Sequence, residues 1–370
     1  MIKSIKAKKI LNSRKEPTVQ VKIISNKGIV KASVPSGAST GTHEAKNVDN
    51  KQAIYNVNKI IAPKLKGMDE TKQKKIDKLL DHKLGANAIL GVSMAVARAG
   101  ALAKKVPLYK HLGLKKSFPK PCFNIINGGK HAKNKLEIQE FMIIPQEESF
   151  KENLRIGKVV FKRLKKALFK KYGRLPMGDE GGFSPPFSKD TKALDFIVEA
   201  IKDYNVKIGL DCAASSFYSK GKYKIDGKKL NKKQLLDFYK DIVKKYPIIS
   251  LEDPFQEKDS KGFEEITKKL KITIIGDDFL TTNIQRIKKY KKCCNGVIIK
   301  PNQIGTVTEA LEAIKLAKSY KWKTMVSHRS GETMDDFIAD LSMGSDYIKS
   351  GAPSKKERLI KYKRLLKIYG

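Results

Sequence analysis

The chain has 370 residues, 40% of them hydrophobic, so it can bury a large core and extensive disorder is not expected. Its 77 Lys and Arg outnumber 38 Asp and Glu, which gives a formal net charge of +39 at pH 7. The most apolar stretch, residues 88–103, is interrupted by Arg98 and is shorter than the roughly 20 residues of a membrane-spanning helix. The first residues lack the apolar segment of a signal peptide, so we expect a cytoplasmic protein with no membrane partner.

The excess of positive charge has two interpretations. It can indicate a protein that binds nucleic acid or anionic membranes, or it can simply reflect a Lys-rich surface. The basic residues are mostly Lys and are spread along the chain, for example over 162–171 and 355–367. We therefore favour a Lys-rich surface, for which non-specific polyanion binding at low salt can follow but specific nucleic-acid binding is not expected.

The cysteines give little sign of a metal site or a disulfide framework, because no C-x-x-C spacing occurs. They are interpreted as small buried residues on strands. The four positions are Cys122, Cys212, Cys293 and Cys294.

Residues 1–115 are predicted to form a smaller α+β domain. Residues 19–23 alternate between apolar and polar, as strands do, and a turn at 26–28 joins them to a partner strand at 30–34. Residues 35–41 are small and flexible enough for a mobile loop. Helical patterns follow at 50–61, 69–80 and 86–104.

Residues 119–370 show a different pattern, in which apolar runs rich in Val and Ile alternate with helical segments. The candidate strands are 122–126, 140–144, 206–211, 248–252, 272–277, 296–300, 323–328 and 346–349. The main helical segments are 150–172, 191–204, 233–245 and 308–318. This alternation predicts an α/β fold with a parallel sheet covered on both faces, and eight strands suggest closure into a TIM-type (β/α)8 barrel.

Six successive predicted strands each end in an ionisable residue. These residues are Asp211, Glu252, Asp277, Lys300, His328 and Lys349. For a single strand, such a residue more often marks the exit of the chain into solvent, but coincidence is a weaker explanation for six in succession. In a barrel, the carboxyl ends of the strands converge on the face where active sites form, so we expect a site there.

Three of these residues, Asp211, Glu252 and Asp277, are carboxylates on neighbouring strands. Mg²⁺ prefers oxygen ligands, so these residues are its candidate ligands. Lys300 follows on the next strand. Beside a bound dication its charged form is disfavoured, so its pKa is expected to fall toward the range of a general base. A structural salt bridge from Lys300 to one carboxylate is the alternative, and the two are compatible.

Glu140 and Glu180 are both candidate acids. Glu140 begins a predicted strand, whereas Glu180 lies in the Gly-rich segment 178–183, where glycines let the backbone turn sharply. If the two glutamates are neighbours, repulsion raises one pKa and leaves a protonated acid near neutral pH. Taken alone, a turn of this kind is more often an exposed loop.

Segments along most of the chain, from Arg14 to Ile368, resemble those of the enolase family in the same order. They include SGASTG at 36–41, GDEGGF at 178–183 and SHRSGET at 327–333, together with 84–93, 124–145, 211–215, 250–255, 300–306 and 348–353. The resemblance implies an enolase-like barrel with an atypical start, preceded by a capping domain. It also implies a carbon–oxygen lyase of glycolysis and gluconeogenesis that reversibly dehydrates 2-phosphoglycerate to phosphoenolpyruvate.

The same resemblance implies a role for each matching residue. Asp211, Glu252 and Asp277 hold a first Mg²⁺, and Ser39 helps to hold a second that arrives with the substrate. Lys300 removes the proton from carbon 2 to give a metal-stabilised enolate, and Glu180 protonates the hydroxyl that leaves carbon 3. The substrate-binding residues are His131, Gln139, Glu140, His328, Arg329, Ser330 and Lys349.

The resemblance implies a shortened and unusually basic member of this family, and a homodimer or higher homo-oligomer. Two alternatives remain. One is another enzyme of the wider enolase superfamily, such as a sugar-acid dehydratase, but the segments 36–41 and 327–333 argue against it. The other is an enolase-derived RNA-binding or surface-adhesion protein, which is disfavoured because none of the catalytic residues is lost.

Overall fold

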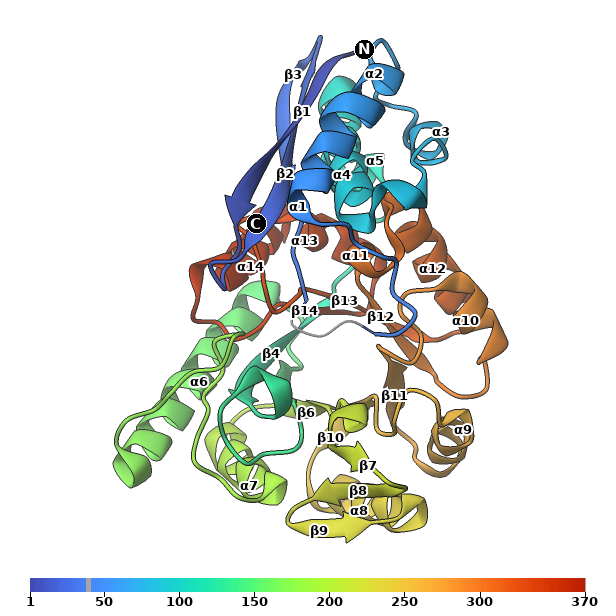
Figure 1. Cartoon of the computed structure of the whole chain (residues 1–370). Helices are drawn as coiled ribbons and strands as arrows, with labels where there is room; N and C mark the ends of the chain where they lie inside the picture. The colour runs from blue at the N-terminus through green and yellow to red at the C-terminus, as the bar shows by residue number, and fades with distance from the viewer. Residues whose placement is uncertain (38–40, 370) are drawn as a thin grey trace.

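The computed structural model describes residues 1–37 and 41–369 of the chain. It has two parts, which lie one above the other in Figure 1. The N-terminal part is an antiparallel sheet with helices packed against it. The larger part is a barrel surrounded by helices. This architecture confirms the predicted fold class.

The N-terminal part begins with strands β1 (Ile2–Leu11), β2 (Pro17–Ser25) and β3 (Gly28–Ser33), which pair in that order. Its helices are α1 (Asn50–Tyr55), η1 (Asn56–Ile61), α2 (Ala62–Leu65), α3 (Gln73–Asp77), η2 (His82–Leu84), α4 (Ala86–Lys104) and α5 (Leu108–His111). The predicted hairpin is present as β2 and β3. The predicted helix at 69–80 is shorter than expected, because only α3 is helical there.

Strand β1 was not predicted, and the reason is local. Its buried residues Ile2, Ile5 and Ala7 do not follow a strict alternation, because the pairing with β2 shifts register between Ile2 and Ser4. An irregularity of this kind breaks the period of two by which a strand is recognised in a sequence.

Helix α4 is the one helix in the described part of the chain with the length and apolar composition to cross a membrane, but 83% of its most apolar window is buried inside the protein. Gly91 explains how closely it packs on the sheet, since a Cβ atom there would lie 2.7 Å from Val21. Helix α4 is therefore the core helix of the N-terminal part.

The barrel strands are β4 (Lys120–Asn127), β5 (Glu140–Pro145), β6 (Val206–Asp211), β10 (Ile248–Glu252), β11 (Thr273–Gly276), β12 (Gly296–Ile299), β13 (Lys323–Ser327) and β14 (Tyr347–Lys349). They form a closed barrel in chain order, with β14 pairing back onto β4. Each predicted strand is present, and its bounds differ by no more than a few residues.

The helices of this part are α6 (Phe150–Tyr172), α7 (Asp190–Ile201), α8 (Lys232–Lys245), α9 (Ser260–Lys269), α10 (Ile284–Lys289), α11 (Pro301–Ile304), α12 (Val307–Ser319), α13 (Phe337–Leu341) and α14 (Lys356–Tyr369). The 3-10 helices are η3 (Gly129–His131), η4 (Ala214–Phe217) and η5 (Ser342–Gly344). A small antiparallel sheet of β7 (Tyr218–Ser219), β8 (Lys222–Ile225) and β9 (Lys228–Leu230) lies outside the barrel and was not predicted.

The parallel sheet has one exception at the start of the barrel, where β5 runs antiparallel to both β4 and β6. The connection from β4 to β5 contains η3 but no long crossover helix, and a parallel pair requires such a crossover. As a result, Glu140 at the start of β5 lies opposite Asp211 at the end of β6.

The core is consistent with this arrangement. A separate cluster of buried side chains comes from the barrel strands and includes Cys122, Met142, Ile275, Ile298 and Met325, as expected for a filled barrel interior. All four cysteines are free and buried, as predicted. Only Cys122 lies on a strand, however, because Cys212 follows β6 and the adjacent pair precedes β12.

Arg98 on α4 joins the two parts of the molecule. Its guanidinium donates to Asp335 at 2.6 and 2.8 Å, to Asp336 at 2.8 Å and to the carbonyl of Lys31 at 2.7 Å. Burial raises the pKa of Asp335, but Arg98 outweighs burial and holds this pKa below its usual value. The pair therefore stabilises the contact between α4 and the loop after β13.

We expect Arg98→Met to lower the free energy of unfolding by about 3 kcal/mol, because it leaves a buried carboxylate unpaired. The ion pair with Asp335 contributes fully to the free energy of unfolding above the ordinary pKa of an aspartate. This contribution is lost as the pH falls through the lowered pKa of Asp335. The difference in unfolding free energy between the wild type and Arg98→Met, measured by urea unfolding, should therefore be smaller in acid. Lys74→Met removes an exposed pair with Glu312 and is the control, with an expected effect of about 0–1 kcal/mol. Equal effects of the two substitutions would contradict the prediction.

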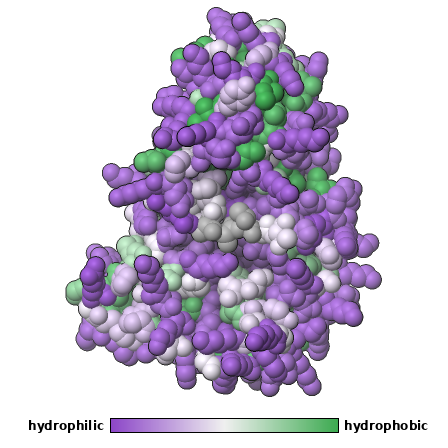
Figure 2. All heavy atoms as spheres, viewed as in Figure 1, coloured by the Kyte–Doolittle hydropathy of each residue, from purple (hydrophilic) through white to green (hydrophobic). Residues whose placement is uncertain are grey.

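The surface agrees with the charge of the sequence. Figure 2 shows a face covered largely by hydrophilic side chains, with hydrophobic ones gathered mainly over the N-terminal part. Most lysines for which an ion pair is seen, such as Lys202 and Lys268, are exposed. One correction concerns the basic segment 355–367, where Arg358 and Lys361 are 0% and 1% exposed and therefore belong to the interior.

Candidate active site

Carboxylates from neighbouring strands lie together at one end of the barrel. Strand β10 pairs with both β6 and β11, so the strands that carry Asp211, Glu252 and Asp277 are adjacent. Asp211, Glu252 and Asp277 are 4%, 0% and 7% exposed, respectively. The reversed direction of β5 adds Glu140 to the group. Such a concentration of buried negative charge requires positive partners.

Lys349, the last residue of β14, lies among these carboxylates and is 1% exposed. Its Nζ atom lies 2.8 Å from Glu252, 3.4 Å from Asp211 and 3.2 Å from Glu140. Burial lowers the pKa of Lys349, but the carboxylates outweigh burial and raise this pKa well above its usual value. Burial and Asp211 together raise the pKa of Glu252.

Lys300 directly follows β12 and forms an ion pair with Asp277. Burial lowers the pKa of Lys300, but Asp277 outweighs it and leaves the pKa above its usual value. Burial raises the pKa of Asp277, but Lys300 outweighs it and lowers this pKa to about 2. The structure thus shows the salt bridge, and the predicted fall of the Lys300 pKa, which was tied to a bound dication, stays a prediction.

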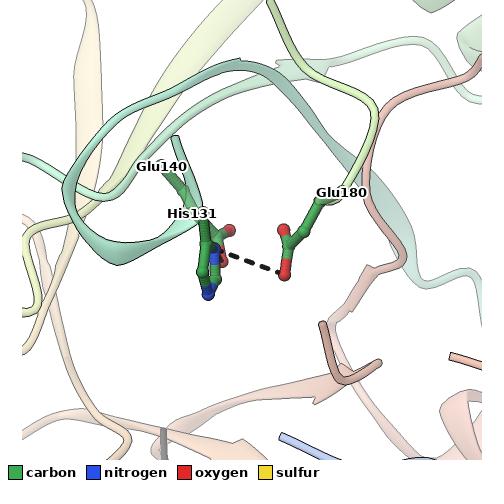
Figure 3. Close-up of side chains that lie close together, drawn as sticks. All are labelled: His131, Glu140 and Glu180. Atoms are coloured by element: carbon green, nitrogen blue, oxygen red, sulfur yellow. Dashed lines mark ion pairs between the residues drawn. The ribbon is translucent and has the colours of Figure 1, made fainter. Parts of the chain in front are cut away.

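The second group of acids surrounds an imidazole. In Figure 3, the side chains of His131, Glu140 and Glu180 point toward one another. The Nδ1 atom of His131 lies 3.8 Å from Glu140 and 3.6 Å from Glu180. Gly181, with a φ of +83°, makes the sharp turn that presents Glu180. Segment 178–183 is therefore not an exposed loop.

The pKa values of the two glutamates are shifted in opposite directions. Burial and the neighbouring Glu180 raise the pKa of Glu140 well above its usual value. Burial also acts to raise the pKa of Glu180, but His328 and His131 outweigh it and hold this pKa well below its usual value. The predicted rise of one pKa is thus seen at Glu140, and which of the two glutamates acts as the acid stays a prediction.

Arg358 on α14 orients His328 behind this group. Its Nη1 atom lies 2.5 Å from Nδ1 of His328. Because a guanidinium can only donate, Nδ1 accepts, and the proton of the neutral ring is on Nε2. Nε2 lies 3.2 Å from Glu180, which also accepts from Asn124 at 2.9 Å. Burial lowers the pKa of His328 to about 3, which favours the neutral ring.

Arg329 and Ser330 follow His328 and are 5% and 4% exposed. Arg329 forms an ion pair with Glu44 at 2.9 Å. The Gln139 side chain lies beside Asp211, with its amide nitrogen 3.4 Å from the carboxylate. Ser39, predicted to hold a second cation, lies outside the described residues.

The predicted site residues line one pocket. It is lined by Gly37, His131, Gln139, Glu140, Glu180, Asp211, Ala213, Asp253, Asp277, Asp278, Lys300, Ser327, His328, Arg329, Ser330 and Lys349. Of the residues predicted for the site and described by the structure, Glu252 alone is not in the lining, and it is held by Lys349. The pocket is therefore lined by ammonium, guanidinium, imidazole and carboxyl groups, which suit a small, polar ligand.

Two groups of side chains are candidates to hold a cation, but among the described residues only the second has its ligand atoms close together. Asp211, Glu252 and Asp277 supply only carboxylate oxygens, which suits Mg²⁺, and the Lys349 ammonium supplies positive charge among them. Among the described residues, the ligand atoms of His131, Glu140 and Glu180 lie within 4.8 Å of one another. An imidazole ligand suits transition metals better than Mg²⁺, so the all-carboxylate group is the better fit.

The amino-acid sequence matches two known domains over nearly its whole length. Residues 2–112 match the enolase N-terminal domain, and residues 115–370 match the enolase C-terminal TIM barrel domain. The chain belongs to the enolase family. An enolase from Methanocaldococcus jannaschii is 46% identical over 399 residues, and one from Methanosarcina barkeri is 48% identical over 401 residues. Each alignment covers 99% of this chain and 94% of the relative.

This enolase family member is an enzyme, a phosphopyruvate hydratase of the lyase class. The alignments are longer than its 370 residues, so the relatives contain positions that this chain lacks. That agrees with the prediction of a shortened member. The alternatives of a sugar-acid dehydratase and of a binding protein without catalysis receive no support from the two named relatives.

Sequence reasoning missed several residues of the site. Asp253 accepts from the backbone N–H groups of Asp277 and Asp278, at 2.9 and 2.7 Å, and so fixes the end of β11. Burial and Asp277 raise the pKa of Asp278 to about 7. Asp253 and Asp278 each follow a strand-end carboxylate directly, which is a signal the sequence offered. Glu44 and Arg358 carried no comparable signal.

Proposed function

We propose that this enzyme reversibly dehydrates 2-phosphoglycerate to phosphoenolpyruvate, with Lys300 as the base and Glu180 as the acid. The observation that supports this most is the shared cavity of Lys300, the Glu140–Glu180 pair and Arg329. It brings together a proton acceptor, a proton donor and an anion-binding guanidinium, which the elimination of water from a phosphorylated acid requires.

We propose that Asp211, Glu252 and Asp277 hold one Mg²⁺ and that a second binds together with the substrate with help from Ser39. Bound in this way, Mg²⁺ supplies Lewis-acid stabilisation of negative charge on the substrate carboxylate. Lys349, which already lies among these carboxylates, adds a further positive charge. Its position supports a role in stabilising the enolate that forms when carbon 2 loses its proton.

Lys300 can accept the carbon 2 proton only when its amine is neutral. In the structure, Asp277 holds it as an ammonium. If Asp277 held a cation, its carboxylate would be less available to Lys300, and burial would then lower the pKa of Lys300. Lys300 is thus proposed to become a base only in the complete site.

Glu180 needs a proton in order to release the carbon 3 hydroxyl as water. We propose that Glu140 supplies it, because burial and Glu180 raise the pKa of Glu140. The ligand atoms of Glu140, Glu180 and His131 lie within 4.8 Å of one another, so the proton has a short path to Glu180. We assign phosphate binding to Arg329 and Ser330, and further contacts to Gln139, His131 and His328.

Magnesium dependence is tested with the wild-type enzyme. We expect EDTA to lower the rate of phosphoenolpyruvate formation, measured by absorbance, by about 10³-fold, because several kcal/mol of charge stabilisation are lost. Added Mg²⁺ should restore the rate. Full turnover in EDTA would contradict the metal assignment, and no turnover in folded, Mg²⁺-loaded protein would contradict the proposed reaction.

We further propose that the reaction serves glycolysis and gluconeogenesis in the cytoplasm and that the enzyme is a homodimer or higher homo-oligomer, as its membership of the enolase family suggests. The division of the chain into domains 1–115 and 119–370 is likewise a proposal. It is supported by the end of α5 at His111 and the start of β4 at Lys120. The charge of +39 supports non-specific polyanion binding at low salt only.

A further inference from the structure

Glu44 holds the guanidinium of Arg329 by two parallel hydrogen bonds. The Nη1 atom donates to Oε2 at 2.9 Å and the Nη2 atom to Oε1 at 3.1 Å. The two side chains are 5% and 6% exposed. A two-point pair of this kind fixes the plane of the guanidinium, and burial protects the pair from solvent screening.

The same carboxylate has other partners. Oε1 of Glu44 accepts from the backbone N–H of Gly41 at 3.0 Å, and the amide of Gln303 lies 3.5 Å away. Gln303 donates to Asp277 at 2.8 Å, and the N–H of Ala45 donates to the Gln303 carbonyl at 2.8 Å. Glu44 is thus anchored and connects Arg329 to the proposed metal ligand Asp277.

Arg329 lines the cavity, whereas Glu44 contacts the guanidinium from outside that lining. We propose that Glu44 is a positioning residue that sets the orientation in which Arg329 receives the phosphate of the substrate. Preorganisation of this kind lowers the entropy that binding has to overcome. The inference rests on the proposed function only in identifying the anion as the substrate phosphate.

The direction in which phosphate affinity changes distinguishes a positioning role of Glu44 from a purely electrostatic one. Glu44→Gln removes a negative charge near the phosphate, and charge alone would make phosphate bind more tightly. Positioning predicts the opposite. We expect Glu44→Gln to raise both KM and the inhibition constant of inorganic phosphate by about tenfold. The value of kcat should change by less than about threefold, because the lost interaction stabilises the bound substrate and the transition state equally.

Glu44→Asp provides a second test, because it keeps the charge and shortens the side chain by one methylene. It should also weaken phosphate binding, by about threefold or more. Glu312→Gln, at an exposed pair with Lys74, is the matched control and should change neither constant. An Arg329→Lys variant has no planar guanidinium at this position for Glu44 to orient. In that variant, Glu44→Gln should weaken phosphate binding by less than about a further twofold.

Calorimetric titration with inorganic phosphate and Mg²⁺ measures the same coupling without turnover. Weaker phosphate binding in both folded Glu44 variants supports the inference even if 2-phosphoglycerate is not the substrate. Unchanged or tighter binding in both variants, or additive effects of Glu44 and Arg329, would overturn it even if the wild-type enzyme turns over 2-phosphoglycerate.

Discussion

Lys300→Ala is expected to lower the rate of phosphoenolpyruvate formation by about 10³-fold at saturating Mg²⁺, because general-base catalysis is lost. The exchange of the carbon 2 proton of 2-phosphoglycerate with solvent, followed by NMR in deuterium oxide, should fall by the same factor. The two rates fall together because proton removal precedes the loss of hydroxide. Carbon 2 exchange at the wild-type rate would show that Lys300 is not the base.

The substitution also removes the partner of Asp277, so two controls are required. Saturating Mg²⁺ compensates any change in metal affinity, and a titration with Mg²⁺ measures that change directly. Lys323→Ala removes an exposed lysine at the start of β13, where it pairs with Asp346, and should leave both rates unchanged. A thermal unfolding curve for each variant confirms that it is folded.

Glu180→Gln is the second large effect, and it should separate the two steps. The amide keeps the shape of the side chain but cannot deliver a proton to the departing hydroxyl. We expect phosphoenolpyruvate formation to fall by about 10²–10³-fold, with carbon 2 exchange reduced much less. The comparison of the two rates in one variant is the measurement.

Equal losses of both rates in Glu180→Gln would contradict its assignment as the acid and favour a role in binding. Glu265→Gln, which breaks an exposed pair with Lys269 on α9, is the control and should affect neither rate. Because the pKa of Glu140 is raised in this structure, a loss of hydroxide release in Glu140→Gln comparable to that in Glu180→Gln would support proton transfer between the two.

The barrel could be predicted because its signals are local. Apolar strands and amphipathic helices alternate from 119 onward, and residues such as Asp211 and Lys300 stand at strand ends in the sequence itself. The burial pattern of β5 does not reveal its direction, because it is the same in a parallel or an antiparallel sheet, and only the missing crossover helix after β4 indicates it. Strand β1 was hidden by its register shift.

The sequence could not show which of the two glutamates has the raised pKa, for a different reason. Repulsion between Glu140 and Glu180 predicts that one pKa rises, but not which one. The outcome depends on His131 and His328, whose imidazoles lie against Glu180. These contacts exist only in the folded chain.

By itself the sequence determined the family, the barrel and the set of strand-end residues, because these depend on periodicity and on short segments. The tertiary structure alone decided how those residues are paired. Arg358 contacts His328 from 30 positions away, and Glu44 contacts Arg329 from 285 positions away. Both side chains look like ordinary surface charges in the sequence. Burial in a medium of low polarity turns them into strong, directional partners of the active site.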